Sequence, residues 1–161
     1  MFIQEAELFK GLDDHIMNEI SKIMVEESCK SGDVLYTDKD RADNFYLLWD
    51  GRIRLAIGTG AEIDYTVSRR GEAFGWSSLV DRDTYTARAE CVAPSKVYRI
   101  PKVKIEELFA KHPEAGALFY KRLAAAVVQR LIWSYRAFLS EGSLKGMTSE
   151  GTRQVAAAGE D

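Results

Sequence analysis

Apolar positions along the chain follow three successive patterns. Over residues 1–24 they recur every three or four residues, which predicts short N-terminal helices. Over residues 25–101 they form short runs rich in β-branched and aromatic side chains, separated by Gly, Asp and Asn, as strands are. Over residues 102–140 the helical spacing returns, interrupted at His112-Pro113. The three segments together predict one domain over residues 1–140, with the last segment forming a hinge and a long helix.

The central segment predicts a mainly β fold. Its short runs are joined by tight turns such as Asp50-Gly51, which favours antiparallel pairing over a βαβ sheet. We therefore expect an antiparallel β-roll (a jelly-roll-like, double-stranded β-helix) flanked by the N-terminal helices and the long C-terminal helix. Residues 141–161 are rich in Gly, Ser and Glu without periodicity, which predicts a flexible tail. The expected strands are DVLYT, NFYLLW, GRIRLAI, EIDYTVSR, TYTARAECV and SKVYRI.

The long helix is apolar on more than one side. A seam of large side chains recurs every three or four residues, approximating a heptad pattern, and a second apolar face runs beside it. A helix with two apolar faces must bury both, which predicts a homodimer. The alternative is one wide face buried within the same chain. The residues assigned to the dimer interface are Phe119, Leu123, Val127, Leu131 and Phe138.

Composition excludes several classes of function. The net charge of -3 across 161 residues offers no general attraction to nucleic acid, and no apolar run is long enough to cross a membrane. Cys29 and Cys91 lie far apart without metal-ligand spacing, and we read them as separate residues of a reduced, cytoplasmic protein. The two histidines, His15 and His112, fall in helical segments. No metal site or catalytic triad is therefore expected, and the protein is predicted not to be an enzyme.

The stretch GEAFGWSSLVDRDTYTARAE, residues 71–90, has the order of an anion-binding turn. Gly71 and Gly75 permit close approach of a ligand to the backbone, and the N–H groups of a short helical turn after Gly75 can converge on a negative charge. Thr86 can add a hydroxyl from the following strand. This pattern predicts a ligand site built on the turn.

These residues resemble the cyclic nucleotide-binding domain of the catabolite activator and fumarate-nitrate regulator (CRP/FNR-like) family. The resemblance extends over residues 8–139. It implies the same order of helices, β-roll, phosphate cassette and long helix, a dimer, and a cyclic nucleotide or other small molecule as the ligand. The motifs that carry it are Gly32, LLWDGRIRL, Gly71-Glu72, Phe74-Gly75 and Thr86-Ala87.

Two positions depart from the family pattern. The resemblance places Trp76 where nucleotide-binding members usually carry a glutamate for the ribose 2′-hydroxyl, and Tyr85 where they carry the arginine that neutralises the cyclic phosphate. A lost charge-assisted pair costs about 1.5–3 kcal/mol. Tight cyclic AMP binding in the usual pose is therefore not expected.

Three interpretations of the cassette remain open. The turn with Ser77, Ser78 and Thr86 could bind an anion if Arg82 or Arg88 replaced the missing arginine. Alternatively, Trp76 and Tyr85 could be the walls of a pocket for an apolar or aromatic ligand. In the third interpretation Trp76 fills the pocket as core and no ligand enters. The predicted ligand-binding set is Gly75, Trp76, Ser77, Ser78, Tyr85, Thr86, Ser134 and Tyr135.

The last two members of that set follow from the resemblance. Ser134 and Tyr135 align with polar residues by which the family's long helix contacts the base. The alternative is that Ser134 is a small residue that permits close helix approach in a dimer seam. Both alternatives place the position on the long helix.

The combined prediction is a non-catalytic, ligand-sensing regulatory module. Only a short polar tail follows the long helix, so we expect no DNA-binding output domain, and the output would pass through an unidentified protein partner. Two alternatives stand beside it. One is a constitutive protein-interaction scaffold with a closed pocket, and the other is a conventional regulator that binds cyclic AMP or cyclic GMP.

Overall fold

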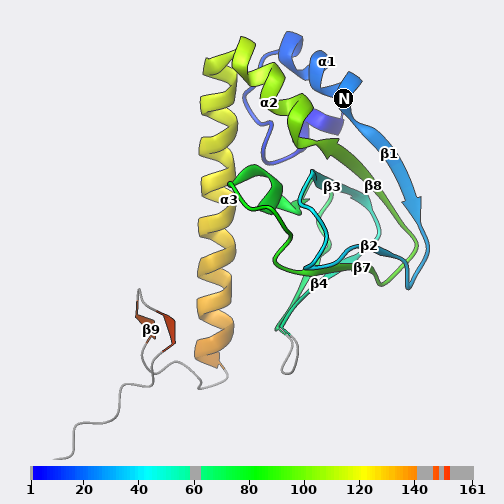
Figure 1. The fold of residues 1–161 in the computed structure, drawn as a ribbon, viewed down its shortest axis with the longest axis vertical. Coiled ribbons are helices and arrows are strands. Elements are labelled where there is room, and N and C mark those ends of the chain that lie inside the picture. The colour runs from blue at the N-terminus through cyan, green and yellow to red at the C-terminus, as the bar shows by residue number, and fades with distance from the viewer. Residues whose placement is uncertain (1, 59–62, 141–146, 149–150, 153–161) are drawn as a thin grey trace, which may run out of the picture. The chain divides into compact units, whose positions relative to one another are not determined.

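The computed structural model describes residues 2–58, 63–140, 147–148 and 151–152. It divides into two units, residues 1–123 and residues 124–161, which are described separately below. The first unit contains the β-roll with the helices that precede and follow it (Figure 1). The predicted fold class, mainly antiparallel β with N-terminal helices and a long C-terminal helix, is confirmed.

The N-terminal segment folds as a 3-10 turn, η1 (Phe2–Glu5), and a helix, α1 (Asp14–Ile23). The helix begins where it does because the Asp13 side chain accepts a hydrogen bond from the Ile16 amide at 2.9 Å. Its apolar stripe buries Ile16 and, on the next turn, Ile20. The helical spacing of the sequence therefore predicted this helix.

The described strands of the first unit form two four-stranded antiparallel sheets. The first sheet has the order β1-β8-β3-β6, with bounds Val25–Cys29, Ser95–Pro101, Asn44–Asp50 and Ala73–Phe74. The second has the order β2-β7-β4-β5, with bounds Val34–Tyr36, Arg88–Cys91, Ile53–Ile57 and Ile63–Val67. Strand β1 was not among the predicted runs because its sequence, VEESC, lacks apolar alternation.

The space between the sheets is the core of the roll. Alternate residues of β3 point into it, among them Tyr46 and Leu48, and they pack with residues of the second sheet such as Leu55. Val34 and Ile57, which also fit a core pattern, are instead 41% and 47% exposed. Val34 is the first residue of β2 and Ile57 is the last residue of β4.

The other face of β3 packs against helices. The Phe45 ring lies 6.4 Å from Phe9 and 5.9 Å from Phe119, measured between ring centroids, and Phe119 is fully buried. After β8 the chain enters α2 (Lys102–Lys111), and α3 (Pro113–Ser140) starts at the predicted break. Figure 1 shows α1 and α2 side by side next to the end of β8. Phe119 and the buried Leu123 therefore belong to the core, which removes them from any surface that a partner chain could contact.

A disulfide joins Cys29 to Cys91, and this corrects our reading of them as separate residues. Cys29 ends β1 in the first sheet and Cys91 ends β7 in the second, so the bond links the two sheets with a Cα–Cα distance of 6.6 Å. Their separation of 62 residues concealed the pairing, since only the sheet arrangement brings the two strand ends together. The bond also weakens the argument for a reduced compartment.

The second unit contains residues 124–140 of α3 and a short hairpin. In the hairpin, β9 (Met147–Thr148) pairs antiparallel with β10 (Gly151–Thr152). The remainder of the predicted flexible tail, residues 141–161, lies outside the described residues.

Candidate functional site

The predicted cassette is built around a glycine in a left-handed conformation. Gly75 follows β6 with φ 72° and precedes a 3-10 turn, η2 (Trp76–Leu79). A Cβ at this position would lie 3.1 Å from Tyr46 Cδ2 and 3.3 Å from the Tyr36 ring. Glycine is therefore required here both by the backbone and by two aromatic side chains pressed against it.

Tyr85, at the position of the family's arginine, points into the roll. It is only 4% exposed, and its ring stacks on Tyr36 with centroids 3.7 Å apart. Its hydroxyl donates to the Asn44 carbonyl at 2.6 Å and accepts from the Asn44 amide at 3.3 Å. The side chain therefore has partners for both its ring and its hydroxyl inside the protein.

Four aromatic rings fill the roll beside the cassette. Besides the Tyr36–Tyr85 pair, Tyr46 lies 5.2 Å from Phe74 and 5.6 Å from Tyr36, centroid to centroid. Burial raises the pKa of the Tyr46 phenol, and that of Tyr85, above the ordinary value. The rings thus remain neutral over the ordinary pH range and make this part of the interior apolar.

The hydroxyl groups of the cassette have hydrogen-bond partners within the cassette itself. The Ser77 and Thr86 hydroxyl oxygens are 3.3 Å apart, and the Ser78 hydroxyl donates to the Gly75 carbonyl at 3.1 Å. The Ser78 amide also donates to the Gly75 carbonyl, at 3.4 Å. Ser77 and Ser78 are buried whereas Thr86 is exposed and Trp76 is half-buried. The predicted ligand residues of the turn, 75–78, therefore lie together with Tyr85 and Thr86. Ser77 and Thr86 form the one hydroxyl pair among them.

The two arginines considered as replacements lie in other surroundings. Arg88 pairs with Glu90, Nη2 to Oε2 3.4 Å, on β7. Arg82 lines a separate hollow together with Arg41 and Lys102. Within the described part of the chain, neither arginine is therefore seen to contact the hydroxyl pair of Ser77 and Thr86: Arg88 pairs with Glu90, and Arg82 lines another hollow.

A buried carboxylate, to which sequence reasoning assigned no role, stabilises the segment that precedes the cassette turn. Glu72 is 3% exposed, accepts from the Tyr65 hydroxyl at 2.6 Å, and accepts from the Ser68 and Arg69 amides at 3.3 and 3.2 Å. These hydrogen bonds stabilise the turn between β5 and β6. The Gly71-Glu72 pair was visible as a motif, but its structural role was not.

Ser134 and Tyr135 lie in the second unit and are described by themselves. The Ser134 hydroxyl donates to the Arg130 carbonyl at 2.9 Å, one helical turn earlier, and Tyr135 is 39% exposed. Their predicted contact with a ligand base therefore stays a prediction.

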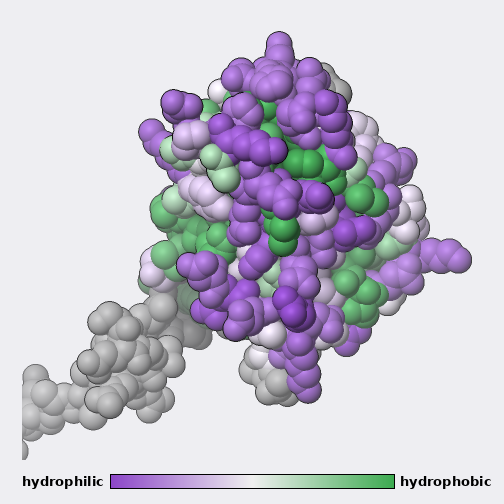
Figure 2. Space-filling model, turned by 45° about the horizontal axis from the view of Figure 1, so that its top comes forward, coloured by the Kyte–Doolittle hydropathy of each residue, from purple (hydrophilic) through white to green (hydrophobic). Residues whose placement is uncertain are grey.

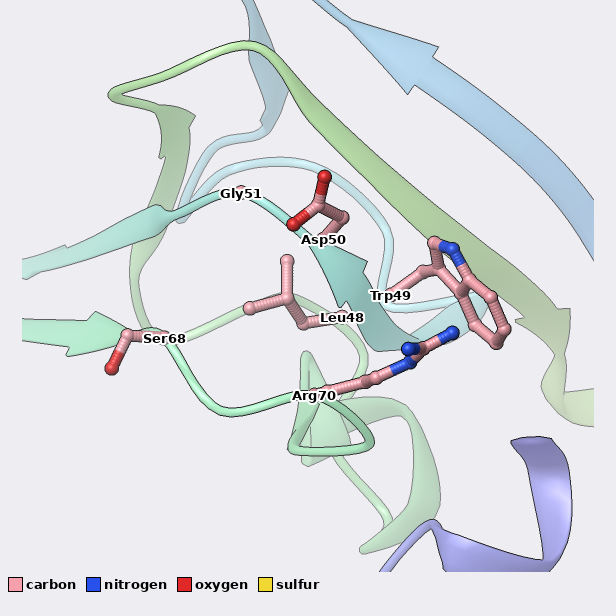
Figure 3. A pocket seen from close by; sticks show the side chains of 6 residues that line it. All are labelled: Leu48, Trp49, Asp50, Gly51, Ser68 and Arg70. Carbon is pink, nitrogen blue, oxygen red and sulfur yellow. The ribbon is translucent and has the colours of Figure 1, made fainter.

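A hollow of about 370 Å³ lies on another part of the roll (Figure 3). It is lined by Leu48, Trp49, Asp50, Gly51, Ser68 and Arg70. Figure 3 shows Arg70 reaching toward Trp49, and its guanidinium carbon lies 3.6 Å from the ring centroid, a cation–π contact. The Arg70 side chain already covers the aromatic surface that a flat ligand would need, and the hollow contains none of the predicted ligand residues.

Other features limit the chemistry available. The described part of the chain contains no group of three or more His, Cys, Asp and Glu side chains able to hold a metal ion. Nor does any described helix combine the length and apolar character needed to cross a bilayer. The face drawn in Figure 2 is largely hydrophilic, and its apolar side chains form separate patches.

Comparison with known protein families gives one assignment. The model of the cyclic nucleotide-binding domain matches residues 26–112, which is more than half of the chain. The matched segment starts at the second residue of β1 and ends between α2 and α3, so it contains the rest of the roll and the cassette.

Solved structures share the fold. A protein from Geobacter metallireducens GS-15 named for cyclic nucleotide binding is 29% identical, with a TM-score of 0.72 over 80% of this chain and 95% of its own. A cyclic nucleotide-binding domain from Methylobacillus flagellatus KT is 18% identical, with a TM-score of 0.77 over 91% and 83%. The regulatory domain of Toxoplasma gondii PKA, crystallised with cAMP, is 17% identical, with a TM-score of 0.65 over 77% and 48%. The last two show the fold alone.

Curated relatives are much longer proteins. Glutaminase 1 of Bradyrhizobium diazoefficiens is 25% identical over 130 residues, covering 81% of this chain and 21% of the relative. A cGMP-dependent protein kinase of Drosophila melanogaster, isozyme 2 forms cD5/T2, is 27% identical over 93 residues, covering 56% and 10%. This chain thus spans about a fifth or less of these relatives.

Proposed function

The chain belongs to the cyclic nucleotide-binding domain family, and on this basis we propose that it is a ligand-sensing regulatory module that does not bind cyclic AMP tightly at its cassette. The family is a regulatory one and generally non-catalytic. The observation that carries the proposal is the burial of Tyr85, hydrogen-bonded to Asn44 and stacked on Tyr36. An arginine at this position would instead present a positive charge to a cyclic phosphate.

Two energetic effects oppose the binding of a cyclic phosphate. A cyclic phosphate in the usual pose would lack its charge-assisted pair, and the apolar rings around Tyr85 would desolvate it without compensation. Making room for it would also require Tyr85 to leave its stack and both hydrogen bonds with Asn44. Each hydrogen bond is worth about 1 kcal/mol net, so both effects oppose binding.

Titration of cyclic AMP and cyclic GMP into the wild type and two variants tests the proposal. Tyr85→Arg restores the family's cation, and Tyr98→Arg makes the same change on β8 at a half-buried tyrosine outside the predicted ligand set. We expect no saturable rise in melting temperature for the wild type or for Tyr98→Arg. We expect a saturable rise for Tyr85→Arg, or for Trp76→Glu/Tyr85→Arg if the single variant binds too weakly to measure.

Micromolar binding of cyclic AMP to the wild type by calorimetry would contradict the proposal. Because a buried arginine can destabilise the fold, circular dichroism of each variant without ligand is the control. The wild-type result stands even if the Tyr85→Arg variant does not fold.

A second candidate is a constitutive scaffold with a closed pocket. The filling of the roll by Tyr36, Tyr46, Phe74 and Tyr85 favours it, since these rings occupy the space beside Gly75. Melting the wild type against a panel of small metabolites separates the two candidates. A sensor's ligand must raise the melting temperature by mass action, whereas a scaffold would respond to none.

We also propose that the second unit mediates homodimerisation. Its helix exposes six large apolar side chains, which at about 100° per residue fall within an arc of about 140°. They are Val127, Val128, Leu131, Ile132, Tyr135 and Leu139. With Phe119 and Leu123 in the core, the interface is confined to this stretch and Phe138. The stripe is wide enough to pack against the same stripe of a second chain.

Sedimentation velocity tests the dimer. We expect the wild type to sediment as a dimer and Leu131→Glu, which places a charge in the stripe, to sediment as a monomer. Gln129→Glu adds the same charge outside the arc and should leave the dimer intact. Monomeric wild-type protein at tens of micromolar would refute this part of the proposal.

The output is proposed to be an unidentified protein partner rather than nucleic acid, in keeping with the net charge of -3. A cytoplasmic location is also proposed, against which the Cys29–Cys91 bond is the opposing observation. Rapid alkylation of thiols in intact cells, followed by mass spectrometry, tests the location. Alkylated cysteines would support it, and a protected pair would contradict it.

A further inference from the structure

A second hollow lies where three segments of the first unit meet. Its volume is about 230 Å³. It is lined by the connection between β2 and β3 (Arg41 to Asp43), the loop between η2 and β7 (Arg82 to Thr84) and Lys102, the first residue of α2. It shares no residue with the predicted ligand-binding set, although Arg82 to Thr84 belong to the same stretch of chain.

Main-chain hydrogen bonds join the three segments. The Ala42 amide donates to the Asp83 carbonyl at 2.9 Å, and Arg41 and Thr84 form an antiparallel bridge. The Lys102 amide donates to the Asp43 carbonyl at 2.9 Å. The walls are therefore held by backbone contacts, and the hollow is formed before any ligand arrives.

The side chains of the hollow carry an excess of positive charge. Three cations, Arg41, Arg82 and Lys102, face two carboxylates, Asp43 and Asp83. Arg41 pairs with Asp43 at 3.4 Å, and both groups are largely exposed, so this pair is weak. Within the part of the chain that the structure describes, the Arg82 and Lys102 side chains form no ion pair or hydrogen bond. Two cations in one hollow are thus left to interact with a ligand.

We propose that this hollow binds a small multivalent oxyanion, of the pyrophosphate or polycarboxylate type. A guanidinium presents a planar fork of donors that matches phosphate or carboxylate oxygens in a bidentate way, and an ammonium adds a point charge. Arg82 and Lys102 supply one of each from different segments, and the Thr84 hydroxyl supplies a neutral donor. Asp83 is exposed, so water screens its repulsion of the anion.

The ligand would couple two parts of the fold. Arg82 belongs to the loop between η2 and β7, which leads to Tyr85 and Thr86, and Lys102 is the first residue of the helix that follows the roll. The same loop contains Asp81, which has a φ of 52°, the only positive φ at a non-glycine among the described residues. An anion bridging Arg82 and Lys102 would therefore fix this loop against the start of α2, and would stabilise the protein by mass action.

Calorimetry and thermal melting with inorganic pyrophosphate, and separately with citrate, test the site. Arg82→Gln and Lys102→Gln remove the two cations. Arg52→Gln and Lys39→Gln make the same charge changes at exposed positions outside the hollow. We expect saturable binding of one pyrophosphate per chain, weakened about tenfold by each change in the hollow and less than about twofold by each control.

The citrate arm identifies the chemistry. Equal binding of citrate and pyrophosphate would support a general oxyanion site, and binding of pyrophosphate alone would support a phosphate site. Absence of saturable binding for either anion would overturn the proposal. So would equal weakening by the hollow and control variants, because that result indicates attraction to net charge alone. The cassette variant Ser77→Ala should bind pyrophosphate like the wild type.

Discussion

The loop between η2 and β7 connects two environments that differ sharply. At Tyr85 the chain points into the roll, where the ring stacks on Tyr36 and the hydroxyl bonds to Asn44. Three residues earlier, Arg82 lines a hollow with two other cations. The interior position that carries a cation in the family is aromatic here, and the loop's cation lies outside. In this loop, Tyr85 therefore contributes to the packed interior, whereas Arg82 contributes a positive charge to the hollow.

The physical reason lies in the cost of burial. A guanidinium among Tyr46, Phe74 and their neighbours would require an anion to be present at all times, since an unpaired buried charge strongly destabilises a fold. A tyrosine with its hydrogen bonds satisfied contributes packing without a ligand. The comparison therefore predicts large stability effects in the interior and binding effects without stability loss in the hollow.

Removal of the Cys29–Cys91 bond should have the largest effect, because it links the two sheets that enclose the aromatic interior. Closure of a loop of 62 residues stabilises by about 4 kcal/mol in the chain-entropy model, so the free energy of unfolding should fall by about that amount on reduction. Urea denaturation with and without dithiothreitol measures it. Identical curves would show that the bond does not form in solution. Pyrophosphate binding should survive mild reduction, since neither cysteine lines the hollow.

Gly75→Ala should destabilise by about 3 kcal/mol, through the positive φ and the contact of the new Cβ with Tyr46 and Tyr36. Gly32→Ala is the matched control, since Gly32 has a φ of 92° but a Cβ added there would meet no atom within 4 Å. It should cost only about 1 kcal/mol. Equal losses in urea denaturation would mean that the rings do not press on the cassette glycine.

Tyr85→Phe should lower the free energy of unfolding by about 1.5 kcal/mol, because the Asn44 amide and carbonyl lose the phenol oxygen that bonds both. Tyr135→Phe, at an exposed position of the second unit, should change it by less than about 0.5 kcal/mol. Chemical denaturation of the two variants measures the difference. A neutral Tyr85→Phe would argue that this residue is not anchored in the interior.

Alkaline pH should weaken the same interior. Burial raises the pKa of Tyr46 above its ordinary value of 10.0, so the folded state favours the neutral phenol. The stabilisation is complete below pH 10 and is lost as pH rises above it, by about 1 kcal/mol between pH 10 and 11. Tyr46→Phe should therefore show a shallower fall in stability over this interval than the wild type. Parallel pH profiles would contradict the burial of this phenol.

Arg82→Gln should have the smallest effect on stability, below about 0.5 kcal/mol, since its side chain makes no ion pair or hydrogen bond within the described residues. The same variant should bind pyrophosphate about tenfold more weakly than the wild type. A large loss of stability without ligand would show that Arg82 has a structural role. It would contradict the claim that the hollow, unlike the interior, affects binding without affecting stability.

Much of the fold was predictable because it depends on local patterns. The period of apolar residues identified α1, α2 and α3, and the Asp13 cap set the start of α1. Strand β1 was not predicted because two glutamates interrupt the alternation of apolar and polar residues in its sequence. For the site, the motif placed Gly75 directly before a short helical turn, whereas its contact with Tyr36 and Tyr46 could not be predicted.

The sequence by itself determined the β-roll with flanking helices, the position of the cassette and the absence of the family's two charged anchors. Only the tertiary structure decided that Tyr36, Tyr46, Phe74 and Tyr85 meet beside Gly75, that Cys29 reaches Cys91, and that Arg82 joins Lys102 in a hollow. The division has a physical cause. Helix periods, turns and glycine conformations are governed by near neighbours along the chain, whereas these contacts join residues that are distant in sequence and are set by how the two sheets and the helices close on one another.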